Sequence, residues 1–389
     1  MPWRFMQYHL KHTLKEIYLR IRKVLLFPFL ILRRIEALEE GEIKSILFLR
    51  HDRVGDMVLS TPVFKALKRS FPDARLTVLA SERNWEVIKN NSNIDETVVY
   101  RGLYRFIKEM RNKGFDLTID PFNTYELKQA LLSYLSGARY RIGFEQAGRE
   151  IFFNIKGPKL QPAKHLVEHI LDLVGYLRCD VNGCEPELFL ADEEVQWASS
   201  FLLNKGIDTS KLTIAIHPGG HYETQKWPSE RVGLVAKKIV EELKANVIIL
   251  AGPDEKAILD RIKQICGSDV FIISNISIRQ VMAVLARCDL FLGNNSGPLH
   301  IAAALGLPTV STMGPTVTPL WLPYGENHIV LRKELDCSPC TKGVCEDHSC
   351  MNLITISDVF EALKSQITRI RSQRKGRVAA HKRAKTITT

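Results

Sequence analysis

From Lys44 onward, the chain alternates short apolar runs with longer amphipathic stretches. In the first half, the apolar runs are Ser45–Leu49, Arg75–Ala80, Thr97–Tyr100 and Phe115–Asp120. A helical pattern over Met57–Arg69 follows the first of them. Because strand-like and helix-like segments alternate, we predict a parallel sheet with helices on both faces.

The second half of the chain repeats this pattern. Its apolar runs are Leu212–His217, Asn246–Ala251, Val270–Ser274, Asp289–Gly293 and Pro308–Met313. The helical stretches between them are Val232–Leu243, Glu255–Ile265, Arg279–Arg287 and Leu299–Leu305. Turn-rich segments at Asp180–Pro186 and Gly206–Ser210 separate the halves, which predicts two doubly wound α/β domains. Ligands of such domains bind at the carboxyl ends of the strands, in a cleft between the sheets.

The composition agrees with two globular domains. The chain has 389 residues, of which 45% are hydrophobic and 25% charged, and this excludes a disordered, collagen-like or multi-span membrane protein. Residues 1–40 hold eight Lys or Arg and four Glu, and residues 364–389 hold nine Lys or Arg and no acid. Subtracting these two ends from the net charge of +11 leaves the body at −2. We therefore expect no nucleic-acid partner for the body.

The N-terminal region contains an apolar run, Val24–Leu32, between basic residues. As a helix, this run would reach about 14 Å, roughly half of a bilayer core, and Pro28 interrupts it, so we expect no membrane span. Arg33 and Arg34 stand where a signal-peptide cleavage site would lie, which argues against a signal peptide. Two alternatives stay open: an interfacial segment on an anionic membrane, or a helix that packs on the protein's own surface.

The C-terminal residues 364–389 show little apolar periodicity beyond Arg371. We expect a solvated, disordered tail, whose functional alternative is attraction to an anionic membrane. Nucleic-acid binding by this tail is the weakest alternative, because no aromatic side chain is interleaved with the charges to stack on bases.

The loop after the first predicted strand concentrates charged residues within Arg50–Pro62. The chain contains no G-x-G-x-x-G and no G-x-x-x-x-G-K-[ST] motif, so phosphates must be held in another way. Gly55 lets the backbone turn tightly beside a ligand, and Asp56 falls at the start of the helix. Asp56 is either a helix cap or a general base that takes a proton from an attacking hydroxyl.

Two loops of the second half carry the residues of an anion site. In His217–Pro228, Lys226 supplies a point charge suited to phosphate, and Ser229 is a candidate N-cap of the next helix. An ordinary turn with a surface lysine is the alternative. In Asn294–His300, we expect Ser296 to cap a helix with Gly297-Pro298 in its first turn and His300 one turn further on. The free amides there form an anion site without a metal, and with Lys226 they can neutralise a leaving diphosphate.

Taken together, these segments resemble the family-nine glycosyltransferases, the lipopolysaccharide heptosyltransferases. The match in order and spacing covers roughly residues 44–363, with Arg50–Pro62, His217–Pro228, Asn294–His300, Met313–Thr316 and Trp321–Gly325. The resemblance implies an α/β GT-B fold, two Rossmann-like doubly wound domains facing a central cleft. It implies an acceptor domain at 44–195, a nucleotide-sugar domain at 196–356 and a helix at 357–370 packing back towards the first domain. The charge and apolar pattern add a basic and apolar N-terminal extension at 1–43 and a basic tail at 371–389.

The same resemblance implies an inverting, metal-independent transfer of heptose from ADP-heptose to a lipopolysaccharide inner-core or related glycan acceptor. By position, Asp56 is the catalytic base, and Arg53 and Gly55 belong to the acceptor-side loop. The residues that bind the donor and its phosphates are Lys226, Glu255, Asn295, Ser296, Gly297 and His300. We expect no cofactor and no metal ligand.

Three of these positions carry open alternatives. Glu255 resembles the family's ribose-contacting acid. The equal alternative is that Glu255 only places a favourable negative charge in the first turn of a helix. Asn295 stands where members carry Asp or Asn, which predicts a weaker sugar contact here. The segment Gly219–Tyr222 departs from members with paired threonines, so the phosphate contacts outside Lys226 stay open.

Four of the eight cysteines form a cluster with the spacing Cys337-x2-Cys340-x4-Cys345-x4-Cys350. Four thiolates this close in sequence could close tetrahedrally on zinc. The second and third gaps are longer than those of a usual zinc knuckle, which favours reduced structural cysteines in a cytoplasmic enzyme.

Other functions stay open beside the favoured one. An epimerase of the same fold would convert a nucleotide sugar without an acceptor, and a non-catalytic nucleotide-sugar binding protein would have no need of a base at Asp56. The favoured interpretation is a cytoplasmic glycosyltransferase, peripheral at the inner membrane, where a lipid-linked glycan acceptor would lie.

Overall fold

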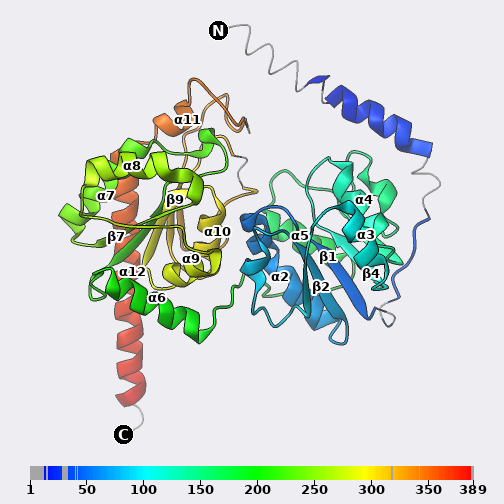
Figure 1. The fold of residues 1–389 in the computed structure, drawn as a ribbon, viewed down its shortest axis with the longest axis horizontal. Helices are drawn as coiled ribbons and strands as arrows, with labels where there is room; N and C mark the ends of the chain where they lie inside the picture. Colours follow the sequence, from blue (N-terminus) through cyan, green and yellow to red (C-terminus); the bar gives the residue numbers. More distant parts are fainter. Residues whose placement is uncertain are drawn as a thin grey trace. The chain divides into compact units, whose positions relative to one another are not determined.

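The computed structural model describes residues 13–14, 16–28, 34–39, 41, 43–316, 319–340 and 342–386, with side chains as far as residue 372. The apolar run that begins at Val24 is therefore described as far as Pro28, and the end of the basic tail lies outside the described residues. The chain divides into two compact units, Met1–Pro186 and Glu187–Thr389, hereafter unit 1 and unit 2 (Figure 1).

The division between the units comes earlier than the predicted boundary after residue 195. Arg279 explains the difference. Its Nε donates to Glu194 Oε1 at 2.7 Å and its Nη2 donates to Phe189 O at 2.7 Å, so the segment before residue 195 is tied to unit 2.

Unit 1 is a five-stranded parallel sheet in the order β3-β2-β1-β4-β5. Its strands are β1 (Ser45–Leu49), β2 (Arg75–Ala80), β3 (Glu96–Val99), β4 (Leu117–Asp120) and β5 (Tyr140–Gly143). Its helices are α2 (Val54–Ser70), α3 (Leu103–Arg111), α4 (Leu127–Leu135) and α5 (Leu166–Gly175), with short 3-10 turns η2 (Trp85–Ile88) and η3 (Arg149–Phe152). The four predicted strands are confirmed, whereas β5 was missed because it is short and ends in glycine.

Alternate residues of β1 point to opposite faces of this sheet, as the period of a strand requires. Leu47 and Leu49 pack with Phe106 of α3 and Leu132 of α4. On the other face, the ring of Phe48 meets that of Phe64 in α2 edge-on, with ring centroids 5.2 Å apart. The buried sheet is thus covered on both sides, and the loops after its strands remain to form a site (Figure 1).

Unit 2 is a six-stranded parallel sheet in the order β11-β10-β9-β6-β7-β8. Its strands are β6 (Thr213–His217), β7 (Asn246–Ala251), β8 (Phe271–Ser274), β9 (Leu290–Asn294), β10 (Thr309–Thr312) and β11 (His328–Leu331). Its helices are α6 (Asp192–Asn204), α7 (Ser229–Leu243), α8 (Lys256–Cys266), α9 (Ile278–Leu285), α10 (Gly297–Ala304), α11 (Ser349–Asn352) and α12 (Ile356–Thr386), with turns η4 (Glu223–Gln225) and η5 (Pro253–Glu255). The five predicted strands and four predicted helices of this half are confirmed within a few residues.

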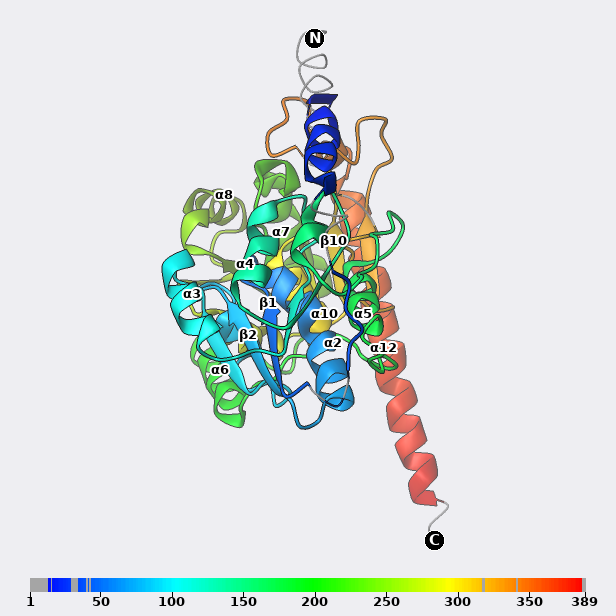
Figure 2. The same ribbon diagram turned by 90° about the vertical axis from the view of Figure 1, so that its right-hand side faces the viewer.

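The last helix, α12, packs on α7, β10 and β11 of its own unit (red in Figure 2). Phe360, Leu363 and Ile367 bury their side chains in the core of unit 2. Nε2 of the Gln366 side chain donates to two backbone carbonyls, Thr309 O at 3.1 Å and Asn327 O at 2.9 Å. The helix expected to end at residue 370 continues to Thr386, because the tail is rich in Arg, Lys and Ala, which favour helices. The tail expected to be disordered is thus helical as far as Thr386.

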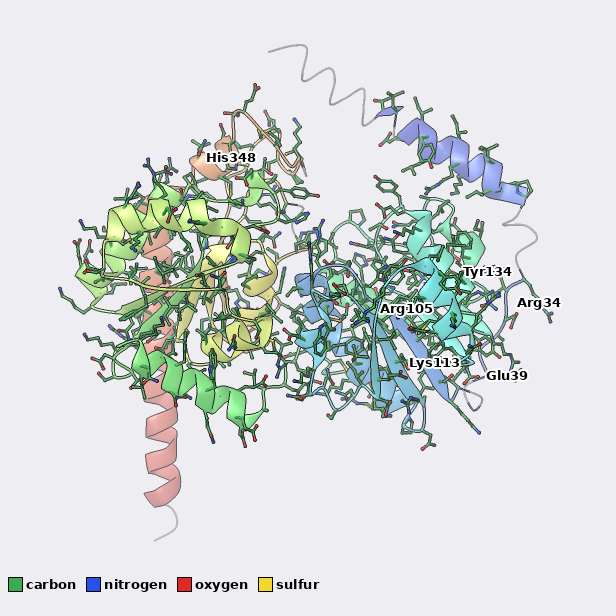
Figure 3. All side chains as sticks on the ribbon, viewed as in Figure 1. Arg34, Glu39, Arg105, Lys113, Tyr134 and His348 are labelled. Atoms are coloured by element: carbon green, nitrogen blue, oxygen red, sulfur yellow. The ribbon has the colours of Figure 1, made fainter. Side chains whose placement is uncertain are left out.

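The described N-terminal residues belong to unit 1. A helix covers residues 16–28, dark blue in Figure 1. After it, the Glu36 amide donates to Asn154 O at 2.8 Å. Oε2 of Glu39, a residue labelled in Figure 3, lies 4.0 Å from Nη2 of Arg139. None of the helices in the described residues is both long enough and apolar enough to cross a bilayer.

Candidate functional site

In each sheet there is one pair of neighbouring strands from which the chain continues outward in opposite directions. The candidate residues lie in loops near these two switch points. In unit 1 the reversal lies between β1 and β4, and in unit 2 between β6 and β9. At such a switch point the loops leaving two neighbouring strands separate and leave room for a ligand beside the carboxyl ends.

Arg50 follows β1 in unit 1, and its guanidinium is buried at the carboxyl end of the sheet. Its Nε donates to Ser60 Oγ at 2.9 Å, its Nη1 to Asp52 Oδ2 at 3.1 Å and its Nη2 to Pro121 O at 3.2 Å. The guanidinium also lies over the ring of Phe122, 5.2 Å from the centroid. Arg50 therefore ties β1, α2 and the loop after β4 into one rigid group.

Asp56 is the third residue of α2 and is only 6% exposed. The N-cap of α2 is Arg53, so Asp56 does not occupy the cap position. Burial raises the pKa of Asp56, the charge of Asp52 raises it further, and Arg50 and Arg53 oppose them, which leaves the pKa at about 7. A carboxyl group with this pKa can accept a proton from a substrate hydroxyl near neutral pH.

Arg53 and Gly55, the predicted acceptor-side residues, border Asp56. Arg53 is exposed beside the start of α2, and its positive charge acts on Asp56. Gly55 is the second residue of α2 and does not have a positive φ. The tight turn expected at Gly55 is therefore not made there, because the helix already begins at Val54, three residues before the predicted helical stretch.

His217 is the centre of the site in unit 2. It ends β6, and its Nε2 lies 3.5 Å from Glu255 Oε2 in the loop after β7. Its Nδ1 lies 3.3 Å from Ser296 Oγ in the loop after β9. One imidazole thus joins two predicted donor residues, Glu255 and Ser296, from the loops on either side. Sequence reasoning did not give His217 a role, although its place at the end of a strand was visible.

Glu255 lies directly against the backbone of Gly219. A Cβ atom on Gly219 would stand 1.5 Å from Glu255 Oε1, so no side chain fits there while the carboxylate keeps its place. Burial alone would raise the pKa of Glu255, but His217, the Gly252 amide and the charge of Lys226 outweigh it and hold the pKa below its usual value. The Gly252 amide donates to Glu255 Oε2 at 2.8 Å. Glu255 is therefore an ionised acceptor within the site.

Asn294 holds the loop that carries Lys226. Its Nδ2 donates to Pro218 O at 2.7 Å and to Gly219 O at 2.9 Å. Its Oδ1 accepts from the Trp227 amide at 3.0 Å and from Thr312 Oγ1 at 2.7 Å. All four hydrogen bonds of this buried amide are thus made inside the protein. Asn294 was quoted in the sequence motif but not predicted as a site residue; a buried polar residue at a strand end was the available signal.

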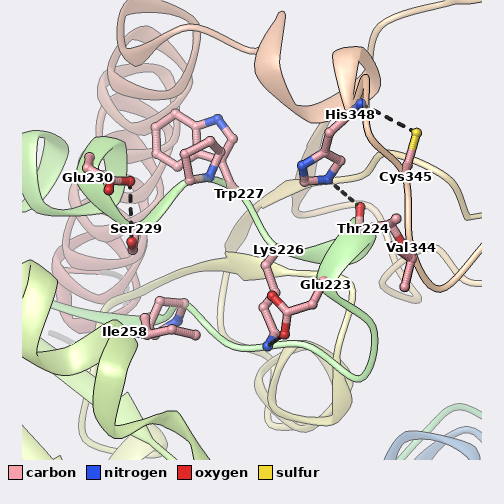
Figure 4. Close-up of a pocket in the computed structure, with 12 residues that line it drawn as sticks. Glu223, Thr224, Lys226, Trp227, Ser229, Glu230, Ile258, Val344, Cys345 and His348 are labelled. Atoms are coloured by element: carbon pink, nitrogen blue, oxygen red, sulfur yellow. Dashed lines mark hydrogen bonds and ion pairs between the residues drawn. The ribbon is translucent and has the colours of Figure 1, made fainter.

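Lys226 borders an open cavity of about 340 Å³ beside α7 (Figure 4). Its ammonium group pairs with the carboxylate of Glu223, a largely exposed residue. Ile258 and Val344 give the cavity apolar walls, and His348 closes another side. The other predicted donor residues do not line this cavity. Ser229, expected to be an N-cap, is the first residue of α7, whose N-cap is Pro228.

The N-terminus of α10 has the predicted arrangement. Ser296 is its N-cap and Gly297-Pro298 form its first turn. The Ser296 side chain makes no capping bond and faces His217 instead. His300 follows one turn later and is buried, whereas Asn295 and Gly297 are half-buried. Backbone amides at this helix end can therefore receive an anion.

The cysteine-rich segment 337–350 covers the loop after β6. Nε2 of His348 lies 2.9 Å from Thr224 O, and the His348 amide donates to Cys345 Sγ at 3.4 Å (Figure 4). All eight cysteines of the chain are free thiols. Burial and the neighbouring thiols of Cys340, Cys337 and Cys345 raise the pKa of Cys350 to about 11.

Comparison with known proteins assigns these features to a family. The model of glycosyltransferase family 9 (heptosyltransferase) matches residues 103–350. A lipopolysaccharide core heptosyltransferase, OpsX of Haemophilus influenzae, is 25% identical over 283 residues, 69% of this chain and 78% of that protein. The crystal structure of E. coli ADP-heptose lipopolysaccharide heptosyltransferase II superposes with a TM-score of 0.70 at 19% identity, over 84% of this chain and 99% of that one. The predicted fold class, GT-B with two Rossmann-like domains, is thereby confirmed.

A more distant structural relative is described as iron-containing. This is the dodecameric glycosyltransferase TibC of enterotoxigenic E. coli, with a TM-score of 0.55 at 12% identity over 87% of this chain and 78% of that one. Among the described residues of the present chain, no three His, Cys, Asp or Glu side chains converge in a way that could hold a metal ion.

Proposed function

Because the chain belongs to glycosyltransferase family 9, the heptosyltransferases, we propose that it transfers heptose from ADP-heptose to a lipopolysaccharide inner-core or related glycan acceptor. The names of its relatives support this choice of donor and acceptor. Unit 1, with Asp56, then supplies the acceptor-side chemistry, and unit 2, with Lys226 and α10, binds the donor.

Asp56 acts as the general base in a single displacement. The acceptor oxygen attacks the anomeric carbon of the heptose while its proton passes to the Asp56 carboxylate, and the bond from that carbon to the diphosphate oxygen breaks. Inversion follows because the nucleophile and the leaving ADP lie on opposite faces of the carbon. The strongest support is the geometry of Asp56, a buried carboxyl with a pKa of about 7 that Arg50 holds in place.

Unit 2 stabilises the charge that develops on the leaving diphosphate. Lys226 supplies a positive charge and exchanges the exposed Glu223 for a phosphate oxygen. The amides that begin α10, together with Ser296 and His300, bind the same group. The ionised Glu255 accepts hydrogen bonds from ribose hydroxyls, with Asn295 and Gly297 beside the sugar. This arrangement carries the reaction without a catalytic metal.

The acceptor places the enzyme at the cytoplasmic surface of the inner membrane. Such glycans are built on a lipid, and the two basic ends of this chain favour an anionic surface. The protein is therefore cytoplasmic and peripheral at that membrane.

The test is the variant Asp56→Ala, with the exposed Asp73→Ala as its matched control. We expect Asp56→Ala to lower kcat for heptose transfer by about 10²- to 10⁴-fold, the usual contribution of a general base, while the Kd for ADP-heptose stays within about twofold. An Asp56→Ala enzyme with native kcat would refute the role of this residue.

A donor screen separates the competing functions. ADP-heptose should raise Tm above that with UDP- or GDP-sugars, because a ligand that binds the native state stabilises it. ADP should appear only when acceptor is present. Conversion of the sugar without an acceptor would indicate an epimerase, and binding without turnover a non-catalytic protein; either result would contradict the proposed transfer.

A further inference from the structure

The N-terminal helix presents an apolar stripe to solvent. Helical backbone covers residues 13–14 and 16–28. Leu14, Tyr18, Ile21 and Leu25 follow the spacing i, i+4, i+7 and i+11, which places them on one side of a helix. The outer stripe consists of these four residues and the adjacent Ile17 and Val24, and each is between 46% and 71% exposed. Surface patches of this kind mark interaction sites.

A side of this helix that borders the stripe is fixed to unit 1. Arg22 is buried, and its Nη2 donates to Tyr125 O at 2.7 Å and also to Ala147 O. Leu26 packs on Gly148, where an added Cβ atom would lie 2.8 Å from Leu26 Cδ1. The helix is thus held along one side, and no residue that the structure describes covers the outer stripe.

These anchor points lie at the edge of the sheet that carries Asp56. Tyr125 is in the loop after β4, and Ala147 is in the loop after β5, so both follow the carboxyl ends of strands. Asp56 follows the carboxyl end of β1, the neighbour of β4 in the same sheet. In a parallel sheet these ends share one edge, and the helix is therefore joined to the catalytic edge of unit 1.

The charges near the stripe select the kind of surface that can cover it. Arg20 and Lys23 are exposed on the same helix, and Arg34 is exposed just beyond it. The first forty residues as a whole hold eight basic and four acidic side chains. Apolar side chains beside exposed cations are typical of helices that lie in the interface of an anionic bilayer.

From these observations we propose that the outer stripe of helix 16–28 is the surface by which the protein binds an anionic lipid bilayer. Apolar side chains of the stripe enter the acyl boundary while Arg20 and Lys23 contact lipid phosphates. Arg22 keeps the helix on the catalytic edge of unit 1, so a lipid-linked acceptor meets Asp56 from the bilayer side. The last point rests on the proposed function, whereas binding to lipid does not.

The test is flotation of the full-length protein with phosphatidylcholine vesicles, with and without about one third phosphatidylglycerol. Ile21→Gln/Leu25→Gln removes apolar area from the stripe without adding charge. Leu103→Gln/Tyr104→Gln on α3 is the matched control, because both of those residues are also exposed and apolar. We expect native protein and control to float with the anionic vesicles, and the stripe variant to bind at least about tenfold less. Arg20→Glu/Lys23→Glu should abolish the preference for anionic lipid.

Equal flotation of the stripe variant and the native protein would overturn the inference. So would a native dimer that the stripe variant converts to monomer without any vesicle binding, since a second copy would then cover the stripe. Transfer to an acceptor stripped of its acyl chains should be unchanged in the stripe variant, whereas transfer to the same acceptor in vesicles should fall. A native protein that floats but transfers no sugar would refute the proposed function and leave the lipid-binding surface intact.

Discussion

Nη1 of Arg50 lies 3.9 Å from Oδ1 of Asp56 and 3.1 Å from Oδ2 of Asp52, so one buried cation is shared by two carboxyl groups. The two acids have different surroundings, because Asp56 is almost fully enclosed and Asp52 reaches solvent. Burial and the charge of Asp52 both favour the protonated form of Asp56. Asp52 is therefore a positioning residue that sets the pH at which Asp56 becomes a base.

The first prediction concerns the pH profile of Asp52→Asn. The native enzyme needs ionised Asp56, so its kcat should rise with pH through about 7. Removal of the Asp52 charge lowers the pKa of Asp56, because the repulsion is lost and Asp56 then becomes the only carboxylate of the pair that the Arg50 guanidinium stabilises. We expect the midpoint of this rise in kcat to move down by about one pH unit in Asp52→Asn. Asp52→Glu keeps the charge and should leave the midpoint in place. The measurement is kcat between pH 5 and 9, and an unchanged midpoint in Asp52→Asn would contradict this coupling.

The second prediction concerns stability. The pKa of Asp56 is raised from 3.8 to about 7 in the folded state, so between these values the folded protein holds a proton that the unfolded chain has lost. The free energy of unfolding therefore falls as pH rises through this range. Asp56→Asn cannot ionise, so at pH 8 it should be more stable than the native protein by at least about 1 kcal/mol, with little difference at pH 4. Urea denaturation at both pH values measures this.

The control for that measurement is Asp73→Asn, which removes an exposed carboxylate of the same unit. It should leave the pH dependence of unfolding as it is in the native protein. If Asp56→Asn and Asp73→Asn gave parallel curves, the carboxyl of Asp56 would not be protonated in the folded state near neutral pH.

The third prediction uses the contact between Gly219 and Glu255. A Cβ atom on Gly219 would displace the Glu255 carboxylate, whereas one on Gly220 would lie 3.4 Å from Lys226 Cγ, within reach of a small adjustment. Gly219→Ala should therefore weaken binding of ADP by at least about tenfold, the effect of losing a charged hydrogen bond, and Gly220→Ala should change it less. The measurement is the Kd for ADP of each variant by calorimetry. Equal Kd values would show that Glu255 does not take part in donor binding.

The fourth prediction concerns the amide of Asn294. Asn294→Ala leaves the carbonyls of Pro218 and Gly219 and the Trp227 amide without their buried partner. We expect a loss of about 2–4 kcal/mol in the free energy of unfolding and weaker ADP binding, because the loop of Lys226 is no longer held. Asn295→Ala should leave stability within about 0.5 kcal/mol, since Asn295 is half-buried. Native stability in Asn294→Ala would show that the loop is held by other contacts.

The two parallel sheets, the family and the loops that carry the chemistry could all be predicted from the sequence. Its alternation of apolar and amphipathic segments located nine strands, because a buried parallel strand must be apolar along its whole length. It missed β5 and β11, which lie at the outer edge of each sheet and are short. Motif order placed Asp56, Lys226 and Ser296 correctly in loops or at helix starts, since those positions depend on local turns.

How these residues act depends on contacts that form only in the folded chain. The pKa of Asp56 depends on burial and on the charges around Arg50, and His217 joins Glu255 to Ser296 across loops that are far apart in sequence. The sequence left open whether the N-terminal helix packs on the protein or faces a membrane, because its amphipathic pattern suits both. The structure places Arg22 inward and leaves the outer stripe exposed. Sequence periodicity gives the faces of a helix, whereas the contacts of the folded chain determine which face is covered.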